Sequence, residues 1–163
     1  MIEKRQFYIN GQWVDTIDGR DHPVINPSTE EQCAVISLGG AKDADAAVAA
    51  AKAAFPAWMK TPIADRIALF KKLLEVYTSR SEDMAQAISL EMGAPIDMSR
   101  QQQVTTGTFH MNGFLKAIEG FQFDRPLGDH APDDRIIYEP IGVCALITPW
   151  SILRLSTPPP VET

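Results

Sequence analysis

The sequence of 163 residues has little cysteine, no long apolar run and no excess of positive charge. Two cysteines, Cys33 and Cys144, are too few for a disulfide framework or a cysteine metal site, and we therefore expect a reducing, cytoplasmic location. The longest apolar run, residues 44–55, contains two charges and is shorter than the ~20 residues that a membrane span needs. No apolar stretch follows the charged residues 3–5, so we expect no secretory signal.

Acidic side chains outnumber basic ones, which bears on the partners of the chain. Fifteen Lys and Arg against 21 Asp and Glu give a formal net charge of −6. Binding to nucleic acid depends on neutralising phosphates, so a surface devoted to nucleic acid is not expected. Hydrophobic residues make up 45% of the chain, which favours a folded protein with an apolar core.

The first forty residues have the pattern of short strands. Asn10-Gly11 lies between two short apolar runs and predicts a hairpin over residues 7–14, because both residues tolerate a positive φ. Residues 23–26 and 32–37 are predicted as two further short strands, and the turn-forming residues 26–29 lie between them. We expect a small antiparallel β element.

Apolar residues at helical spacing follow and predict a block of helices. Trp58, Phe70 and Phe114 fall on the apolar stripes and are expected in the core. The first helix is predicted to begin at the N-cap Asp43 and to end at Pro56, and the second to begin at Thr61-Pro62. Ser81 and Gly93 are predicted to cap the third helix, and residues 97–119 to form a fourth.

The pattern returns to β after residue 120. Residues 121–127 and 135–139 predict a hairpin across the polar turn 128–134. The unbroken apolar run Gly142–Ile147 is typical of a parallel strand that is buried on both faces. Such a strand needs a parallel neighbour after a crossover, which the residues that follow do not provide, so we expect an interrupted protein. The proline triplet in residues 151–163 predicts an irregular tail.

No constellation of residues predicts a catalytic centre within the chain. Cys33 and Cys144 lie in apolar runs and are interpreted as packing residues. The three histidines have no cysteine or carboxylate at metal-ligand spacing, and the carboxylate pairs lie in turns or at helix starts, where they have structural roles. Gly39-Gly40 is not followed by the residues of a phosphate-binding loop.

The order of short motifs resembles the amino-terminal third of the NAD(P)⁺-dependent aldehyde dehydrogenase superfamily, over about residues 6–150. The most specific motif is Tyr138–Val143 leading to Ile147–Trp150. The other matching segments are residues 7–13, 26–30 and 47–58, Arg66 with Leu69, and residues 91–95.

The resemblance implies a partial α/β fold with amino-terminal β-hairpins, a helical block, an oligomerisation β-hairpin and the first strand of a Rossmann-like sheet. Residues 1–121 would be the amino-terminal part of a cofactor-binding domain. Residues 122–140 would be the oligomerisation hairpin and residues 141–150 the first strand of the sheet. Residues 151–163 do not match the family.

The same resemblance implies site residues. The residues beside NAD or NADP would be Ile147, Thr148, Pro149 and Trp150, since ligands bind beyond the carboxyl ends of strands in open α/β sheets. The Trp150 side chain would either face the ligand or pack in the protein core. Ser151 stands where the family has an asparagine that stabilises the oxyanion. Val24, Ile25 and Glu91 correspond to a monovalent cation site of some members, with a plain end-of-helix carboxylate as the alternative reading of Glu91.

The function that follows is that of a truncated aldehyde dehydrogenase subunit. The parent activity would be oxidation of a small-molecule aldehyde to a carboxylic acid through a cysteine thiohemiacetal, in an enzyme that is a homo-oligomer. The family's catalytic cysteine and glutamate have no counterpart here, so this chain alone is expected to be inactive. The alternative is a non-catalytic assembly fragment that pairs with full-length subunits through residues 122–140. Neither reading involves a membrane.

Overall fold

The first hairpin forms where the sequence predicts it. The computed structural model describes residues 1–147, in which β2 (Phe7–Ile9) and β3 (Gln12–Val14) pair antiparallel. Asn10 and Gly11 have φ angles of 53° and 77°, the positive values of a type I′ turn. Tyr8 lies opposite Trp13 with ring centroids 5.3 Å apart, so an aromatic pair supports the register.

A second, three-stranded sheet has the order β1-β5-β4, with β1 at Ile2–Lys4, β4 at Arg20–Asn26 and β5 at Glu31–Leu38. The β4–β5 pair is antiparallel and confirms the predicted strands. The Asn26 side chain closes their turn by accepting the Ser28 N–H at 2.9 Å. The prediction of a purely antiparallel element is wrong, because the unpredicted β1 pairs parallel with β5. Three residues at the start of the chain carry too little pattern to predict a strand.

Helix α1 (Ala41–Trp58) differs from its prediction at both ends. Its N-cap is Gly40, and Asp43 lies one turn further in, where its carboxylate accepts the Gly40 N–H at 2.9 Å. Pro56 lies inside the last turn and does not end the helix. A proline removes only its own N–H, and the Met59 N–H still reaches the Phe55 carbonyl at 2.8 Å.

Helices α2 (Ile63–Ser79) and α3 (Ser81–Met92) confirm the predicted helical block. The N-cap of α2 is Pro62 and not Thr61. Ser81 does not cap α3, because its hydroxyl donates back to the Thr78 carbonyl at 2.7 Å. Gly93 ends α3 in the left-handed conformation with φ 66°, as predicted.

The fourth predicted helix is continuous but irregular. It comprises α4 (Ile96–Met98), a π-helical turn η1 (Ser99–Gln103) and α5 (Val104–Glu119). The buried core lies where this helix crosses α2 and α3, and consists of Tyr77, Ala85, Ile88 and Val104. The Tyr77 hydroxyl donates to the Val104 carbonyl at 2.9 Å, which joins α2 to the start of α5.

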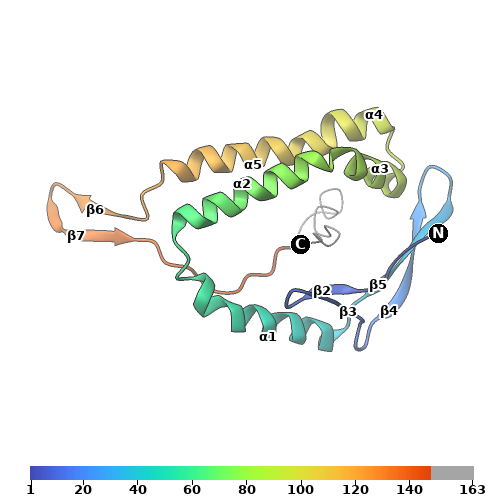
Figure 1. Ribbon diagram of the computed structural model, residues 1–163, viewed down its shortest axis with the longest axis horizontal. Helices are drawn as coiled ribbons and strands as arrows, with labels where there is room; N and C mark the ends of the chain where they lie inside the picture. Colours follow the sequence, from blue (N-terminus) through green and yellow to red (C-terminus); the bar gives the residue numbers. More distant parts are fainter. Residues whose placement is uncertain (148–163) are drawn as a thin grey trace.

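The predicted hairpin after residue 120 forms with a shorter turn. Strands β6 (Asp124–Gly128) and β7 (Ala131–Ile137) pair antiparallel, and only Asp129 and His130 separate them. Residues 131–134 were predicted as part of a polar turn that ends in Asp133-Asp134, but both faces of this hairpin are largely exposed and tolerate charged side chains. The hairpin projects beyond the ends of α2 and α5 (Figure 1).

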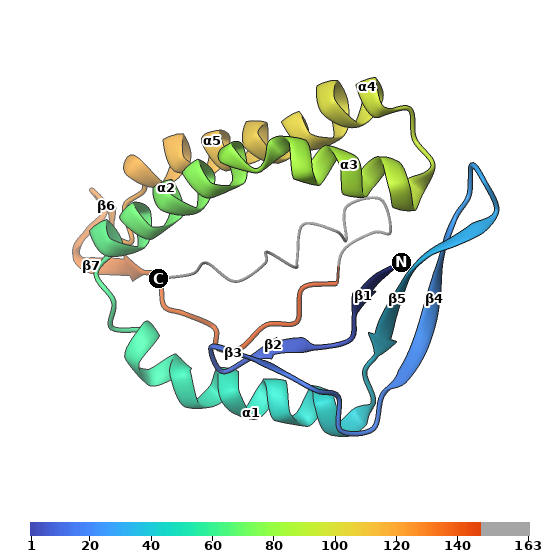
Figure 2. The ribbon, with the colours of Figure 1, turned by 45° about the vertical axis from the view of Figure 1, so that its right-hand side comes forward.

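The predicted strand Gly142–Ile147 does not form. Residues 138–147 have no regular secondary structure and run between α1 on one side and the α2–α5 pair on the other (Figure 2). A strand exists only when a neighbour accepts and donates its backbone hydrogen bonds, and no strand of the described residues pairs with residues 142–147. The mixed α/β class is confirmed. No helix in residues 1–147 combines the length and apolar character that crossing a membrane requires.

Candidate functional site

The candidate cofactor residues lie at the end of the described chain. Ile147 is the last described residue, and its side chain is 92% exposed. Thr148, Pro149, Trp150 and Ser151 lie outside the described residues. The described part of the site is therefore one exposed apolar side chain, with no surrounding walls against which a dinucleotide would pack. The exposed Ile147 side chain does not by itself form a surface that fits NAD or NADP.

The candidate cation residues lie where α3 ends beside the three-stranded sheet. Strand β4 has a register shift between Val24 and Ile25, and such a bulge leaves part of the ladder unpaired. A side chain on Gly93, two residues after Glu91, would meet Pro27 Cγ and Ser28 N at 2.9 Å, so the end of α3 packs closely on the turn that follows β4.

The chemistry of this neighbourhood is that of backbone oxygens with one carboxylate. Within residues 1–147 no three His, Cys, Asp or Glu side chains gather in a way that could hold a metal ion. The Val24 carbonyl accepts a hydrogen bond from the Cys33 thiol at 3.4 Å. Main-chain carbonyls and a single carboxylate suit a hard cation of low charge better than a transition metal. The three residues remain a predicted site.

The two cysteines occupy different settings. Cys33 is half-buried in β5, as its interpretation as a packing residue requires. Cys144 is exposed, so that interpretation is wrong for it in this structure. The reason is the missing strand, since Cys144 belongs to the apolar run that has no neighbours. The Cys33 thiol donates to the Val24 carbonyl at 3.4 Å and the Cys144 thiol to the Gly142 carbonyl at 3.7 Å.

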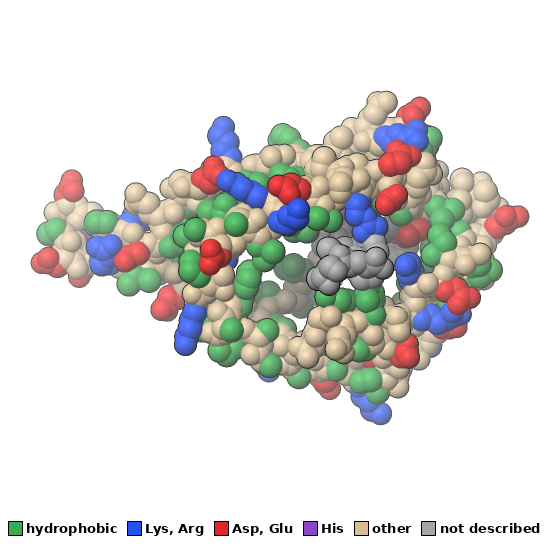
Figure 3. Space-filling view, in the orientation of Figure 1, with side chains coloured by type: hydrophobic (Ala, Val, Ile, Leu, Met, Phe, Trp, Pro, Cys, Tyr) green, Lys and Arg blue, Asp and Glu red, His purple; other side chains and the backbone are tan. Residues whose placement is uncertain are grey.

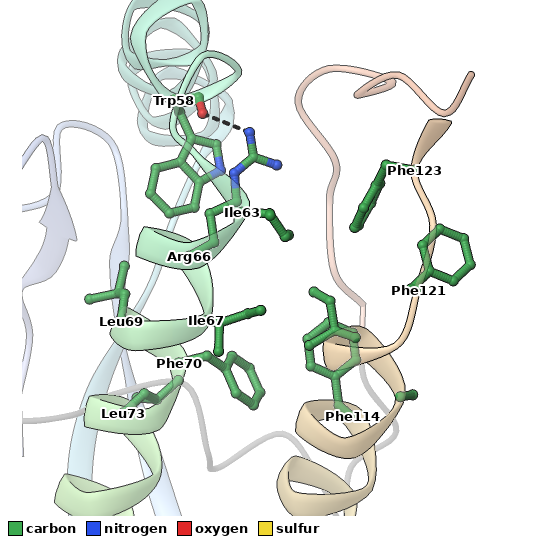
Figure 4. A pocket seen from close by; sticks show the side chains of 12 residues that line it. Trp58, Ile63, Arg66, Ile67, Leu69, Phe70, Leu73, Phe114, Phe121 and Phe123 are labelled. Carbon is green, nitrogen blue, oxygen red and sulfur yellow. Dashed lines mark hydrogen bonds between the residues drawn. The ribbon is translucent and has the colours of Figure 1, made fainter. Parts of the chain in front are cut away.

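An apolar groove of about 590 Å³ opens between α2, the end of α5 and residues 121–123 (Figure 4). Phe70 and Phe114 face each other across it with ring centroids 5.0 Å apart. Both were predicted as core with Trp58, but Trp58 and Phe114 are about half exposed, so the prediction is wrong for these two. The groove is lined by Trp58, Ile63, Arg66, Ile67, Leu69, Phe70, Leu73, Phe114, Ala117, Ile118, Phe121 and Phe123.

Arg66 closes one end of the groove. Its Nη2 donates to the carbonyls of Trp58 at 3.1 Å and Met59 at 3.0 Å, which lie at the end of α1. Its guanidinium also lies 5.6 Å from the centre of the Trp58 ring, within the range of a cation–π contact. Arg66 therefore fixes the turn from α1 into α2 and sets the shape of the groove.

The hairpin β6–β7 is anchored at its base by aromatic contacts. Phe121 contacts Phe123 and Tyr138 with ring centroids 4.8 and 5.1 Å apart. The Tyr138 N–H donates to the Phe123 carbonyl at 2.9 Å and extends the pairing beyond β7. In this two-stranded sheet each strand has one edge without a partner, which is the feature by which a sheet accepts a further strand.

A polar centre that the sequence pattern did not predict lies at the start of α1, around Asp43. The Asp43 carboxylate accepts the Ile17 N–H and the Thr16 hydroxyl, both at 2.7 Å, besides the Gly40 N–H. These hydrogen bonds, led by that from Ile17, lower the pKa of Asp43 from 3.8 to about 2. Asp43 thus ties the loop before β4 to the helix. An acidic residue three positions after a glycine N-cap was the available signal.

Comparison with known proteins agrees with this architecture. The sequence model of the aldehyde dehydrogenase family matches residues 13–152. The chain is 38% identical over 152 residues to 3-succinoylsemialdehyde-pyridine dehydrogenase from a Pseudomonas species, covering 93% of this chain and 31% of that protein. It therefore spans about a third of the length of this curated relative.

Solved structures give the same result. An aldehyde dehydrogenase from Bartonella henselae is 51% identical and superposes with a TM-score of 0.78, covering 79% of this chain and 27% of that one. A variant of aldehyde dehydrogenase C from Pseudomonas syringae, solved with NAD⁺ and octanal, is 38% identical with a TM-score of 0.73, over 76% of this chain and 26% of that one. The chain belongs to the aldehyde dehydrogenase family.

Proposed function

We propose that the chain supplies the amino-terminal framework of an aldehyde dehydrogenase subunit. The parent reaction is the NAD(P)⁺-dependent oxidation of an aldehyde to a carboxylic acid, through a thiohemiacetal on a cysteine outside this chain. The observation that carries the proposal is the superposition on a 51% identical aldehyde dehydrogenase over 79% of the chain. The NAD⁺ and octanal bound to the Pseudomonas syringae relative support the cofactor and substrate class.

Within a complete subunit, Ile147, Thr148, Pro149 and Trp150 would form one wall of the cofactor site. Ser151 would replace an amide donor to the oxyanion with a shorter hydroxyl, and losing one such donor costs ~10²–10³ in rate. The subunit would be a cytoplasmic homo-oligomer, in keeping with a chain that has two cysteines and no disulfide.

We expect no turnover from this chain alone, because by the resemblance neither Cys33 nor Cys144 corresponds to the family's catalytic cysteine. The test is to mix the pure chain with NAD⁺ or NADP⁺ and aliphatic, aromatic and semialdehyde substrates, and to follow reduced cofactor by absorbance. A full-length relative is the positive control. Reduction of the cofactor that Cys33→Ser or Cys144→Ser abolishes would contradict the proposal.

The cation site is a further part of the proposal. The main-chain oxygens near Val24 and Ile25, with the Glu91 carboxylate, would hold a monovalent cation at the end of α3. Thermal unfolding in potassium chloride and in choline chloride at equal ionic strength tests it. The midpoint should be higher in potassium for the natural chain but equal in both salts for Glu91→Gln. Equal midpoints for the natural chain would leave Glu91 as an ordinary end-of-helix carboxylate.

A second candidate function is non-catalytic assembly with full-length subunits through residues 122–140. The open edges of β6 and β7 and the projection of the hairpin beyond the helices favour it (Figure 1). Co-expression with a full-length relative, followed by size-exclusion chromatography, tests this function. A complex that survives deletion of residues 124–137, or no complex at all, would exclude the hairpin as the contact.

A further inference from the structure

The chain contains the dipeptide Asn-Gly twice, at Asn10-Gly11 and at Asn112-Gly113. An asparagine followed by glycine is prone to deamidation, because no side chain on the glycine shields its backbone nitrogen from the asparagine amide. All four residues are exposed. Sequence and exposure therefore do not distinguish the two sites, and any difference in their reactivity comes from the surrounding structure.

The second of these dipeptides is held in a packed helix. It lies in the middle of α5, where Nδ2 of the Asn112 side chain donates to the Thr108 carbonyl at 2.8 Å. The residues that follow anchor this turn of the helix, since Leu115 is buried and Phe114 contacts Phe70 of α2 with ring centroids 5.0 Å apart. Freeing the backbone at Asn112 therefore requires the opening of a helix interior that is packed on its neighbour.

The first dipeptide lacks these restraints. Asn10 and Gly11 form the turn between β2 and β3, which are three residues long each, and a two-stranded hairpin of this size has little stability of its own. Within residues 1–147, no hydrogen bond holds the Asn10 side chain or the Gly11 N–H. A Cβ on Gly11 would meet no atom within 4 Å, so the turn has free space in which to change its conformation.

We propose that Asn10 is a site of spontaneous deamidation and that the fold protects Asn112 from the same reaction. The Gly11 nitrogen forms a bond to Cγ of Asn10, the bond from Cγ to Nδ2 breaks, and Nδ2 leaves as ammonia with the proton of the Gly11 N–H. One water molecule then opens the five-membered imide at either carbonyl, which gives aspartate or isoaspartate. Figure 3, in the orientation of Figure 1, shows the region of β2 and β3 at the surface of the molecule, so this water has access.

The turn must open before the ring can close. Asn10 has a left-handed backbone with φ 53°, and in a type I′ turn the nitrogen of the next residue points away from the side chain. Rotation about the Asn10 Cα–C bond brings the Gly11 nitrogen to Cγ and disrupts the pairing of only three residues in each strand. The rate at each asparagine follows the free energy of local opening, which is lower for this hairpin than for the interior of α5.

Isoaspartate at this position changes the backbone as well as the charge. The main chain then runs through the former side chain, which adds one carbon atom to a two-residue turn that matches the twist of its strands. The contact between Tyr8 and Trp13 depends on the register that this turn sets. A Cβ on Gly39 would meet the Phe7 ring at 3.2 Å, so β2 also lies against the residues before α1. The modification therefore loosens β2 and its contact with the start of the helical block.

The experiment is incubation of the pure chain at mildly alkaline pH, in native buffer and in concentrated urea, with peptide mapping by mass spectrometry over time. Trypsin releases the two asparagines in separate peptides. In native buffer, deamidation should be at least about 10-fold faster at Asn10 than at Asn112, because the hairpin opens more readily than the helix. In urea the two rates should agree within about 3-fold, because both asparagines precede glycine and neither is held by structure.

Two matched variants and a stability measurement complete the test. Asn10→Gln should prevent most of the deamidation in native buffer, because glutamine would have to close a larger ring, whereas Asn112→Gln should leave it unchanged. The purified isoaspartate form should melt at a lower temperature than Asn10→Asp, which has the same charge on an unaltered backbone. Equal rates at the two asparagines in native buffer, a faster reaction at Asn112, or no reaction at Asn10 while the chain in urea reacts, would overturn the proposal. An isoaspartate form as stable as Asn10→Asp would refute the loosening of β2.

Discussion

The contact between Tyr77 and Gly107 gives the sharpest prediction about stability. A Cβ on Gly107 would lie 2.3 Å from the Tyr77 hydroxyl oxygen and 2.6 Å from the ring carbon that carries it. Tyr77 is buried and its hydroxyl donates to the Val104 carbonyl, so the ring has no free space to move into. Gly107→Ala should therefore destabilise the chain, although alanine is the better helix former.

The magnitude follows from three effects. Alanine in a helix interior gains about 1 kcal/mol over glycine. Overpacking of a tight core costs about 1–3 kcal/mol, and displacing Tyr77 loses a hydrogen bond worth about 1 kcal/mol. The expected net loss is about 1–3 kcal/mol in the free energy of unfolding, or a fall of about 3–9 °C in the melting temperature.

Gly113 provides the matched control on the same helix. A Cβ there meets no atom within 4 Å, so Gly113→Ala should stabilise the chain by about 0.5–1 kcal/mol. Urea unfolding followed by circular dichroism compares the two variants with the natural chain. Tyr77→Phe combined with Gly107→Ala should recover only part of the loss, because the ring carbon remains at 2.6 Å. A Gly107→Ala variant as stable as Gly113→Ala would refute the packing of α2 on α5.

Three further changes test the local structure by urea unfolding. Gly93→Ala should cost about 1–3 kcal/mol, because a Cβ at φ 66° is strained and would meet Pro27 at 2.9 Å; an unchanged midpoint would contradict the docking of α3 on the sheet. Arg66→Ala should lower the free energy of unfolding by about 1 kcal/mol, because the hydrogen bonds to two carbonyls are lost. Arg66→Lys should restore less than half of that loss, and full restoration would show that the charge alone matters. The lowered pKa of Asp43 contributes stability that is fully present above pH 3.8 and is lost as the pH falls towards about 2. Asp43→Asn should therefore lower the free energy of unfolding at pH 6 and lower it less at pH 2.5. An equal effect at both pH values would contradict the role of the charge.

Local chemistry made part of the fold predictable. Asn10-Gly11 specifies its turn because a positive φ at two successive residues is costly for most side chains, and the structure has both. Gly93 ends α3 for the same reason. At these turns one or two adjacent residues determine the backbone conformation, so the sequence alone is enough to predict it.

Interactions between distant segments were not predictable in the same way. Asp43 was interpreted as an N-cap, a purely local role, but its main hydrogen bonds come from residues 16 and 17 in the loop before β4. The parallel pairing of β1 with β5 joins segments about thirty residues apart and likewise has no local signal. For the candidate site, the sequence indicated Val24, Ile25 and Glu91 only through a family resemblance, since main-chain carbonyls leave no trace in residue types.

The errors in the predicted core have a single physical cause. The apolar spacing on α1 and α5 and the run Gly142–Ile147 both indicate surfaces that must be covered. The hydrophobic effect favours their burial whatever molecule covers them. For Trp58 and Phe114 the prediction assigned that covering to the chain itself, whereas both are about half exposed. Cys144, predicted to pack, is exposed within the run that was expected to lack a parallel neighbour. A pattern of apolar residues therefore specifies that a contact exists and not the molecule that makes it.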